Sequence, residues 1–202
     1  MTEGARERIL RAAVRRIAGD GIDAVRIARI AMDAGVSTAL VHYHFATREA
    51  LLAEALEYSF AQAGDFRTMR GDGLLRAMVD ECLPLPGEQE TEWVLWVELW
   101  LRAVRHPELR PFAAEQYERM RVWLAEAIED GVARGEFLPV DAGTVADRVL
   151  ALIDGFGVRA LLGDPAMPVE RVREEVWAVL ARDLGLEREE EGSCEEMTGT
   201  GH

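Results

Sequence analysis

The chain is poor in cysteine and contains no lysine. Only two of its 202 residues are cysteines, Cys82 and Cys194, and neither has a histidine or cysteine nearby at metal-ligand spacing. The sequence therefore predicts neither a disulfide framework nor a zinc site. All 23 basic residues are arginine, which we attribute to genome composition. We expect a protein of the reducing cytoplasm that needs no metal and no cofactor.

Long apolar runs and catalytic motifs are also missing. No uninterrupted apolar run approaches the roughly 18 residues that a membrane span needs, and the N-terminus lacks the apolar stretch of a signal peptide. There is no G-x-S-x-G, no H-E-x-x-H, no phosphate-cradling glycine loop and no Cys/His pairing typical of nucleophilic catalysis. We therefore expect neither a membrane protein nor an enzyme.

Charge is unevenly distributed along the chain. The formal net charge is -14, yet residues 1–50 hold eight arginines against six acidic residues, a balance of +2, so the rest of the chain has a net charge of -16. A mildly basic head joined to a strongly acidic body indicates different partners for the two parts. The hydrophobic fraction of 49% is sufficient for a sizeable buried core.

The hydrophobic pattern predicts an all-α protein, because apolar residues recur every three or four positions in nearly every segment. In the head, helices over 10–17 and 27–34 are followed by Gly35, which suits the left-handed end of a helix. Ser37 can cap a short third helix, and Thr47 can cap a fourth. A helix, a turn containing glycine and a second short helix form a helix-turn-helix, whose second helix enters the DNA major groove.

The short third helix has two distinct faces. At 100° per residue, Val41 and Phe45 share one face, which we expect to be buried, while Ala39 and Tyr43 point the opposite way. The outward residues are small, apolar or aromatic with hydrogen-bonding tips, and these suit thymine methyls, base edges and phosphate oxygens. The alternative, in which Tyr43 is a core aromatic residue, remains open at this point.

The head also resembles a known family. The stretch RILRAAVRRIAGDG, followed by IARIAMDAGVSTALVHYHFATREALL, is similar to the DNA-binding head of the TetR (tetracycline-repressor) family over residues 5–56 without gaps. The resemblance implies that Arg48 takes the place of the usual phosphate-binding lysine. It implies that the DNA-facing residues are Thr38, Ala39, Leu40, His42, Tyr43, His44 and Arg48.

Two positions depart from the family pattern. Val25-Arg26 stands where a capping threonine or serine is common, so a phosphate contact there would fall to Arg26 or Arg29. His42 stands where tyrosine is common, which changes the expected base preference. A metal site at His42 and His44 is disfavoured, because side chains two positions apart on a helix diverge.

The resemblance, together with the acidic composition after Gly185, divides the chain into three regions. We expect a helix-turn-helix domain over residues 1–47, a helical ligand-binding and dimerisation domain over 48–185, and a disordered acidic tail over 186–202. Within the body, LWLRAVRHPELRPF, ARGEF and LALIDGF are similar to relatives of the choline-responsive repressor. In such proteins the last two long helices pair with their copies from a second subunit.

The last two predicted helices, 144–163 and 169–184, each present a broad apolar stripe, as a homodimer interface requires. A dimer also fits the head, because two short recognition helices related by a twofold axis read both half-sites of a palindrome. The predicted interface residues are Val145, Val149, Leu152, Val172, Val176 and Val179.

The segments before these two helices enclose a small-molecule cavity in TetR-like proteins. From the residues alone, the tryptophan stripe of EWVLWVELWLRAV favours an ordinary core, whereas the resemblance favours an aromatic cavity wall. Aromatic faces together with a carboxylate favour a cation, such as a quaternary ammonium or polyamine-like compound. Two alternatives remain open: Glu98 is solvated, or Asp154 bonds to an arginine or a backbone amide. The predicted ligand-binding residues are Trp93, Trp96, Trp100, Glu98, Tyr117, Met120, Trp123 and Asp154.

These expectations combine into one function: a ligand-responsive, DNA-binding transcriptional regulator, namely a repressor that a small-molecule inducer releases from palindromic double-stranded operator DNA. The alternative is a helical dimeric protein that binds a small molecule without acting through DNA. Salt-sensitive binding to upstream DNA separates the two, because only the regulator neutralises phosphates.

Overall fold

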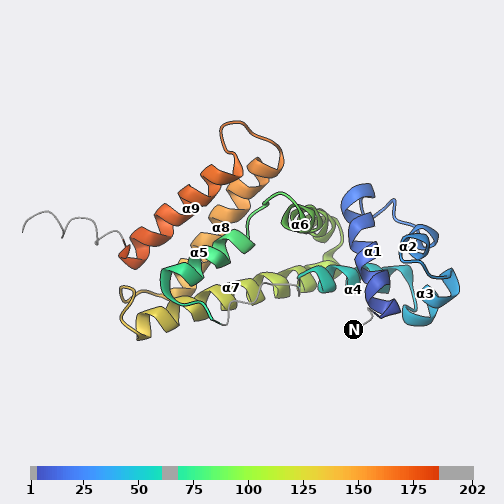
Figure 1. Ribbon diagram of the computed structural model, residues 1–202, viewed down its shortest axis with the longest axis horizontal. Helices are drawn as coiled ribbons and strands as arrows, with labels where there is room; N and C mark the ends of the chain where they lie inside the picture. Colours follow the sequence, from blue (N-terminus) through green and yellow to red (C-terminus); the bar gives the residue numbers. More distant parts are fainter. Residues whose placement is uncertain (1–3, 61–67, 187–202) are drawn as a thin grey trace, which may run out of the picture. The chain divides into compact units, whose positions relative to one another are not determined.

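The computed structural model describes residues 4–60 and 68–186, and within these ranges the chain is helical with no strand (Figure 1). The predicted all-α class is confirmed. The helices are α1 (Ala5–Asp20), α2 (Ile27–Asp33), α3 (Thr38–His44), α4 (Arg48–Phe60), α5 (Gly71–Glu81), α6 (Glu88–Arg105), the 3-10 turn η1 (Pro107–Leu109), α7 (Arg110–Ala133), α8 (Ala142–Leu161) and α9 (Val169–Leu184).

The described residues form two compact units. The first contains α1 to α4, α6, η1 and the start of α7 up to Gln116, and the second contains α5, α7 from Tyr117, α8 and α9. The helix-turn-helix therefore packs together with α4 and α6, so the units do not follow the predicted boundary between residues 47 and 48. Apart from Leu186, the predicted acidic tail lies outside the described residues.

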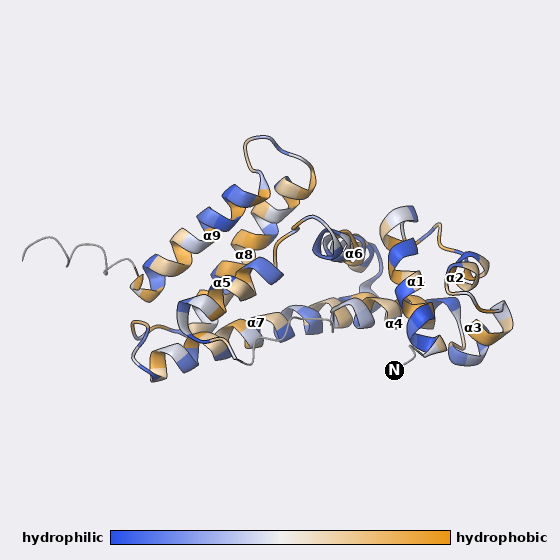
Figure 2. Ribbon diagram, viewed as in Figure 1, coloured by the Kyte–Doolittle hydropathy of each residue, from blue (hydrophilic) through white to orange (hydrophobic). Residues whose placement is uncertain are grey.

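The first unit is built around α1. Ile9, Ala13 and Ile17 recur every four residues on α1, and each has no exposed surface. They belong to a core that includes residues of α2, α3, α4 and α6. Each of the two fully buried isoleucines contributes about 1.5–3 kcal/mol. Figure 2 shows hydrophobic and hydrophilic residues on each labelled helix, as amphipathic helices require.

The second unit is built around the hairpin of α8 and α9. Gly185 ends α9 in the left-handed conformation, with φ of 74°. The backbone N–H of Leu138 donates to the carbonyl of Leu184 at 2.9 Å, which attaches the α7–α8 connection to this helix end. In the same connection the Phe137 ring lies against Gly131, where a Cβ atom would come within 2.1 Å of the ring. These contacts fix the end of α7 beside the α8–α9 hairpin.

Candidate DNA interface and ligand-binding residues

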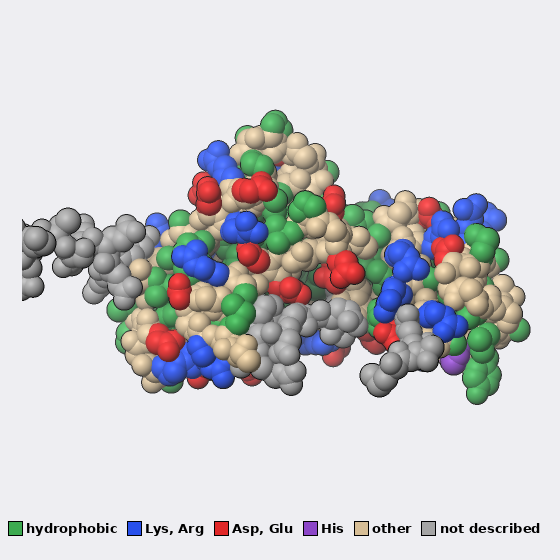
Figure 3. All heavy atoms as spheres, in the orientation of Figure 1, with side chains coloured by type: hydrophobic (Ala, Val, Ile, Leu, Met, Phe, Trp, Pro, Cys, Tyr) green, Lys and Arg blue, Asp and Glu red, His purple; other side chains and the backbone are tan. Residues whose placement is uncertain are grey.

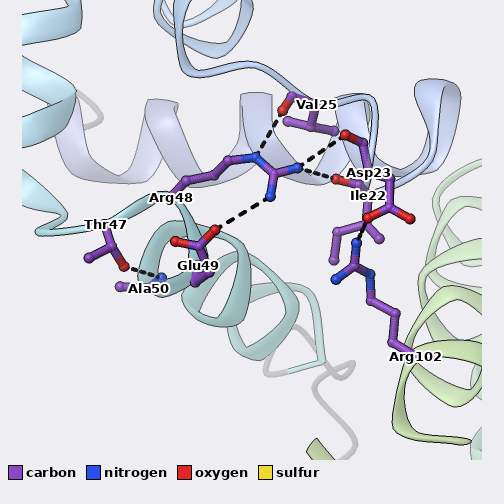
Figure 4. Close-up of polar contacts among 8 residues, drawn as sticks. All are labelled: Ile22, Asp23, Val25, Thr47, Arg48, Glu49, Ala50 and Arg102. Atoms are coloured by element: carbon purple, nitrogen blue, oxygen red, sulfur yellow. Dashed lines mark hydrogen bonds and ion pairs between the residues drawn. The ribbon is translucent and has the colours of Figure 1, made fainter. Parts of the chain in front are cut away.

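Short-range capping bonds fix the starts of α3 and α4. Gly35 adopts a φ of 64° in the turn after α2. The Ser37 Oγ atom accepts a hydrogen bond from the Leu40 N–H at 3.2 Å, and Thr47 Oγ1 accepts one from the Ala50 N–H at 3.0 Å (Figure 4). These are the roles that the sequence predicts for the glycine and both caps. Side-chain caps satisfy N–H groups that the first turn of a helix leaves unpaired.

The two faces of α3 are confirmed. Val41 and Phe45 are buried, with 0% and 2% of their surface exposed. Tyr43 is 81% exposed, so the alternative of a core tyrosine is wrong. The Tyr43 and His44 rings meet edge-on, with centroids 5.2 Å apart. Thr38, Ala39 and His42 are also exposed, and Leu40 and His44 are half-buried.

Two exposed arginines belong to α2, the helix that precedes α3, and to its N-terminal end. Arg26 immediately precedes α2, Arg29 lies in its first turn, and both are exposed. In the space-filling view, arginine side chains gather over α1 and beside α2 (Figure 3). An exposed guanidinium group is well suited to a phosphate oxygen. Phosphate binding by Arg26 and Arg29 stays a prediction.

Arg48 points into the protein fold. Its guanidinium group donates to three carbonyl oxygens of the loop between α1 and α2: Nε to Val25 at 3.1 Å, and Nη2 to Ile22 at 2.6 Å and Asp23 at 3.3 Å (Figure 4). Nη1 also lies 3.7 Å from a carboxylate oxygen of Glu49. The sequence gives no sign of these bonds, because any residue type supplies a backbone carbonyl.

A second arginine ties α1 to the end of α2. Arg16 donates to both carboxylate oxygens of Asp33, at 2.5 and 3.0 Å, and its Nη1 reaches Asp20 at 3.2 Å. The hydrogen bonds from Arg16 lower the pKa of Asp33 below its ordinary value. This two-pronged pairing holds the helix that precedes the recognition helix. The pairing could not be predicted from the sequence, because Arg16 and Asp33 are 17 residues apart and meet only in the folded chain.

Four predicted ligand residues lie on α6 in the first unit. The Trp93 and Trp100 ring centroids are 6.2 Å apart and nearly perpendicular, and those of Trp96 and Trp100 are 6.0 Å apart. Trp93 is buried, whereas Trp96 and Trp100 are half-buried. Glu98 places a carboxylate oxygen beside Gly21, 3.4 Å from where a Cβ atom would stand. The three tryptophans thus form one aromatic cluster, with Glu98 directed toward the α1–α2 loop.

The other four predicted ligand residues lie in the second unit. The Tyr117 hydroxyl donates to a carboxylate oxygen of Asp154 at 2.8 Å, a partner that the sequence pattern does not reveal. Burial raises the pKa of Asp154 above its ordinary value, and the bond from Tyr117 partly offsets that rise. Burial and the neighbouring carboxylate likewise raise the pKa of Tyr117. Met120 and Trp123, on the same helix as Tyr117, are half-buried.

The predicted dimer residues occupy two kinds of position on α8 and α9. Val145, Val149, Val172 and Val176 are at most 4% exposed within a single chain. The two helices pack against each other, so these valines lie within the protomer and offer little area to a second copy. The remaining two, Leu152 and Val179, are half-buried.

Within residues 4–60 and 68–186, no three histidine, cysteine or acidic side chains are grouped so that they could hold a metal ion. None of the helices described in these ranges is long and apolar enough to cross a membrane.

Both parts of the chain match known protein families. Residues 9–55 match the family described as bacterial regulatory proteins, tetR family. Residues 72–185 match the family described as BetI-type transcriptional repressor, C-terminal. The two matches together cover most of the chain and agree with the helix-turn-helix and the helical body described above.

Similar proteins extend over nearly the same length. A transcriptional regulator from Saccharomonospora viridis, solved in complex with choline, is 33% identical with a TM-score of 0.77, over 89% of this chain and 97% of that chain. A TetR-family regulator from Rhodococcus sp. is 28% identical with a TM-score of 0.78, over 89% and 98%. The regulator BetI 1 of Chromohalobacter salexigens is 25% identical over 187 residues, 89% of this chain and 90% of that protein. The chain therefore belongs to the TetR family of bacterial transcriptional regulators, and its C-terminal region is of the BetI type.

Proposed function

We propose that this regulator is a homodimeric repressor that reads a palindromic operator through α3 and leaves it when a small cation binds. The observation that carries the operator proposal is the outer face of α3, where Tyr43 is 81% exposed in the last turn of a helix whose start is capped by Ser37. An exposed tyrosine can offer its hydroxyl to the phosphate and sugar oxygens of DNA. One such helix reads few base pairs, so two are needed for a specific site.

Two groups of residues would contact different parts of the DNA. The exposed side chains of α3 supply hydroxyl, imidazole and apolar contacts to base edges. Arg26 and Arg29 supply charge to the phosphates, which sets position on the duplex and makes affinity depend on salt. The protein would act in the cytoplasm, where it has access to DNA.

The salt dependence of DNA affinity distinguishes this function from that of a ligand-binding dimer that does not bind DNA. We expect the affinity for DNA upstream of the protein's own gene to fall steeply with salt, with a logarithmic slope of about -0.9 per phosphate neutralised. Fluorescence anisotropy of labelled upstream and scrambled duplexes measures both slope and preference. Equal, salt-insensitive binding to both duplexes would favour the alternative function.

The outward sides of α8 and α9 are the proposed dimer surface. Ala151 and Gly155 on α8 and Ala178 on α9 are exposed, and a Cβ atom on Gly155 would meet nothing within 4 Å. Small side chains permit the helices of a second copy to approach closely and form a four-helix bundle. Leu152 and Val179, half-buried in one chain, would supply apolar area at the edge of this contact.

Ala178→Arg should separate the dimer without unfolding the protomer. Position 178 is exposed in a single chain, so the arginine remains solvated in the monomer but becomes buried in the dimer. A buried charge without a partner costs about 3–5 kcal/mol, so the dimer dissociation constant should rise by about 100-fold or more. Sedimentation velocity at micromolar concentration measures the change, and Ala133→Arg, at an exposed position of α7, is the control. A wild-type chain that is monomeric under these conditions would contradict the proposed dimer.

The inducer proposal rests on the Tyr117–Asp154 pair. A half-buried carboxylate with a single hydrogen bond keeps further acceptor capacity, and Trp123 lies on the same helix as Tyr117. A carboxylate and aromatic faces suit a quaternary ammonium ion, which cannot donate a conventional hydrogen bond and is held by charge and cation–π attraction. The S. viridis regulator was solved in complex with choline. Choline is accordingly the first probe for this chain.

Asp154→Asn should weaken choline binding by about 10- to 100-fold, because the carboxylate is the group that compensates the ligand's charge. Burial raises the pKa of Asp154, so wild-type affinity should begin to fall, as pH is lowered, well above the ordinary aspartate pKa. The variant should lack this pH dependence. Calorimetric titration across pH measures both effects, with Glu98→Gln as a variant of equal charge change. Unaltered choline affinity in Asp154→Asn would remove the cation proposal.

The same raised pKa predicts a gain in stability for Asp154→Asn without ligand. A folded-state pKa above the unfolded value stabilises the fold fully below the unfolded pKa. That contribution is lost as pH rises through the folded pKa. At neutral pH the ionised, half-buried carboxylate therefore opposes folding, and the neutral amide should raise the melting temperature.

A further inference from the structure

The loop between α1 and α2 needs hydrogen-bond donors from elsewhere in the fold. Ile22 and Val25 anchor this loop in the core, with 4% and 3% of their surface exposed. Within the loop, the Ala24 N–H donates to the Gly21 carbonyl at 3.1 Å. The carbonyls in the partly buried part of this loop need donors, because a buried carbonyl without a donor destabilises the fold.

Arg48 supplies these donors from the first turn of α4. Its Nε atom reaches the Val25 carbonyl, and one Nη atom reaches the carbonyls of Ile22 and Asp23. The planar guanidinium group presents N–H bonds in several fixed directions at once. A lysine ammonium is a single centre on a flexible stem, so it cannot reproduce the same set of contacts. The Arg48 side chain is 29% exposed, which fits a group turned largely into the fold.

We infer that Arg48 is a positioning residue, which holds the α1–α2 loop and the start of α2 against α4, and that it is not a phosphate ligand. The inference rests on the proposed operator binding, because its functional consequence is the orientation of α3. The recognition helix joins α2 on one side and α4 on the other through short connections. A clamp between the starts of α2 and α4 therefore fixes both ends of the segment that carries α3.

A second arginine reaches the same loop from α6. Arg102 forms an ion pair with the carboxylate of Asp23, whose backbone carbonyl already accepts from Arg48 (Figure 4). Asp23 thus contacts Arg48 of α4 through its backbone carbonyl and Arg102 of α6 through its carboxylate. The Asp23 side chain is 92% exposed, so this ion pair adds little stability compared with the part-buried bonds from Arg48 to the carbonyls of Val25 and Ile22. Asp23→Asn removes the carboxylate and leaves the carbonyl, which makes it a matched control for the Arg48 contacts.

The test compares Arg48→Ala and Arg48→Lys with Arg29→Ala and Asp23→Asn. Affinities for the operator and for unrelated DNA are measured at several salt concentrations, below the melting transition of each variant. Arg48→Ala and Arg48→Lys should both lower the ratio of operator to unrelated affinity by about tenfold or more, with the salt slope of the wild type. Arg29→Ala should weaken both DNAs in parallel and reduce the slope by about one. Asp23→Asn should change the ratio by less than about threefold, consistent with an exposed pair.

Hydrogen exchange of the DNA-free protein tests the clamp without relying on DNA binding. The Ala24 amide, bonded to Gly21 within the loop, should exchange at least about tenfold faster in both Arg48 variants. Wild-type Ala24 exchange in both variants would overturn the inference even if the operator is bound normally. A wild-type operator ratio in Arg48→Lys, together with a slope reduced by one in Arg48→Ala, would also overturn it and identify a phosphate ligand. If the wild type does not bind the operator, that result counts against the proposed function. The hydrogen-exchange result then decides by itself whether Arg48 holds the α1–α2 loop.

Discussion

Tyr43→Ala is expected to weaken operator binding by about 1–3 kcal/mol while leaving the melting temperature close to that of the wild type. Tyr43 is 81% exposed, so its removal leaves no cavity in the protein. Its ring contacts His44 edge-on, and the hydroxyl is available to a base edge or a phosphate. Anisotropy with labelled operator measures the loss, and Tyr43→Phe separates the hydroxyl from the ring.

The opposite face of α3 provides the control for this substitution. Phe45 is 2% exposed, and Phe45→Ala should cost about 3–5 kcal/mol of folding stability through the cavity it leaves. A stability loss for Phe45→Ala and a DNA-affinity loss for Tyr43→Ala would assign one face to the core and the other to the operator. A folded Tyr43→Ala variant with wild-type affinity would mean that α3 does not read the DNA.

Val176→Arg is expected to destabilise the second unit by several kcal/mol. Val176 has no exposed surface in a single chain, and α9 packs against both α5 and α8, so an arginine at this position would be buried inside the protomer. Thermal unfolding followed by circular dichroism measures the effect. Ala178→Arg introduces the same side chain two positions away at an exposed site and should leave the protomer folded.

This pair of variants distinguishes packing within the chain from packing between chains. If the buried face of α9 packs within one protomer, Val176→Arg lowers the melting temperature and Ala178→Arg changes only the oligomeric state. A Val176→Arg protein that melts like the wild type but is monomeric would mean that this face of α9 packs between subunits instead.

The recognition helix was predictable because local rules determine it. Ser37 and Thr47 cap helices through bonds to residues three positions ahead, and Gly35 is one of the few residues that adopt a positive φ without strain. The buried and exposed faces of α3 follow from helical geometry once its bounds are known. Each of these features depends on sequence separations of a few residues.

Contacts between distant segments were not predictable in the same way. Arg48 binds carbonyls 23 to 26 residues away, and a carbonyl carries no side-chain signature. Tyr117 and Asp154 are 37 residues apart on different helices. The periodicity of the α8 and α9 valines indicates an apolar face, but the same spacing arises whether that face packs within the chain or on a second copy.

Selection of bound fragments from the source genome tests the central claim most directly, when wild type and Tyr43→Ala are compared in parallel. A dimer that reads DNA through α3 should enrich a pseudo-palindrome with half-sites about one helical turn apart, and the enrichment should be lost with Tyr43→Ala. Recovery of no common sequence by the wild type, or of the same sequence by both proteins, would contradict the assignment of α3 as the operator-reading helix.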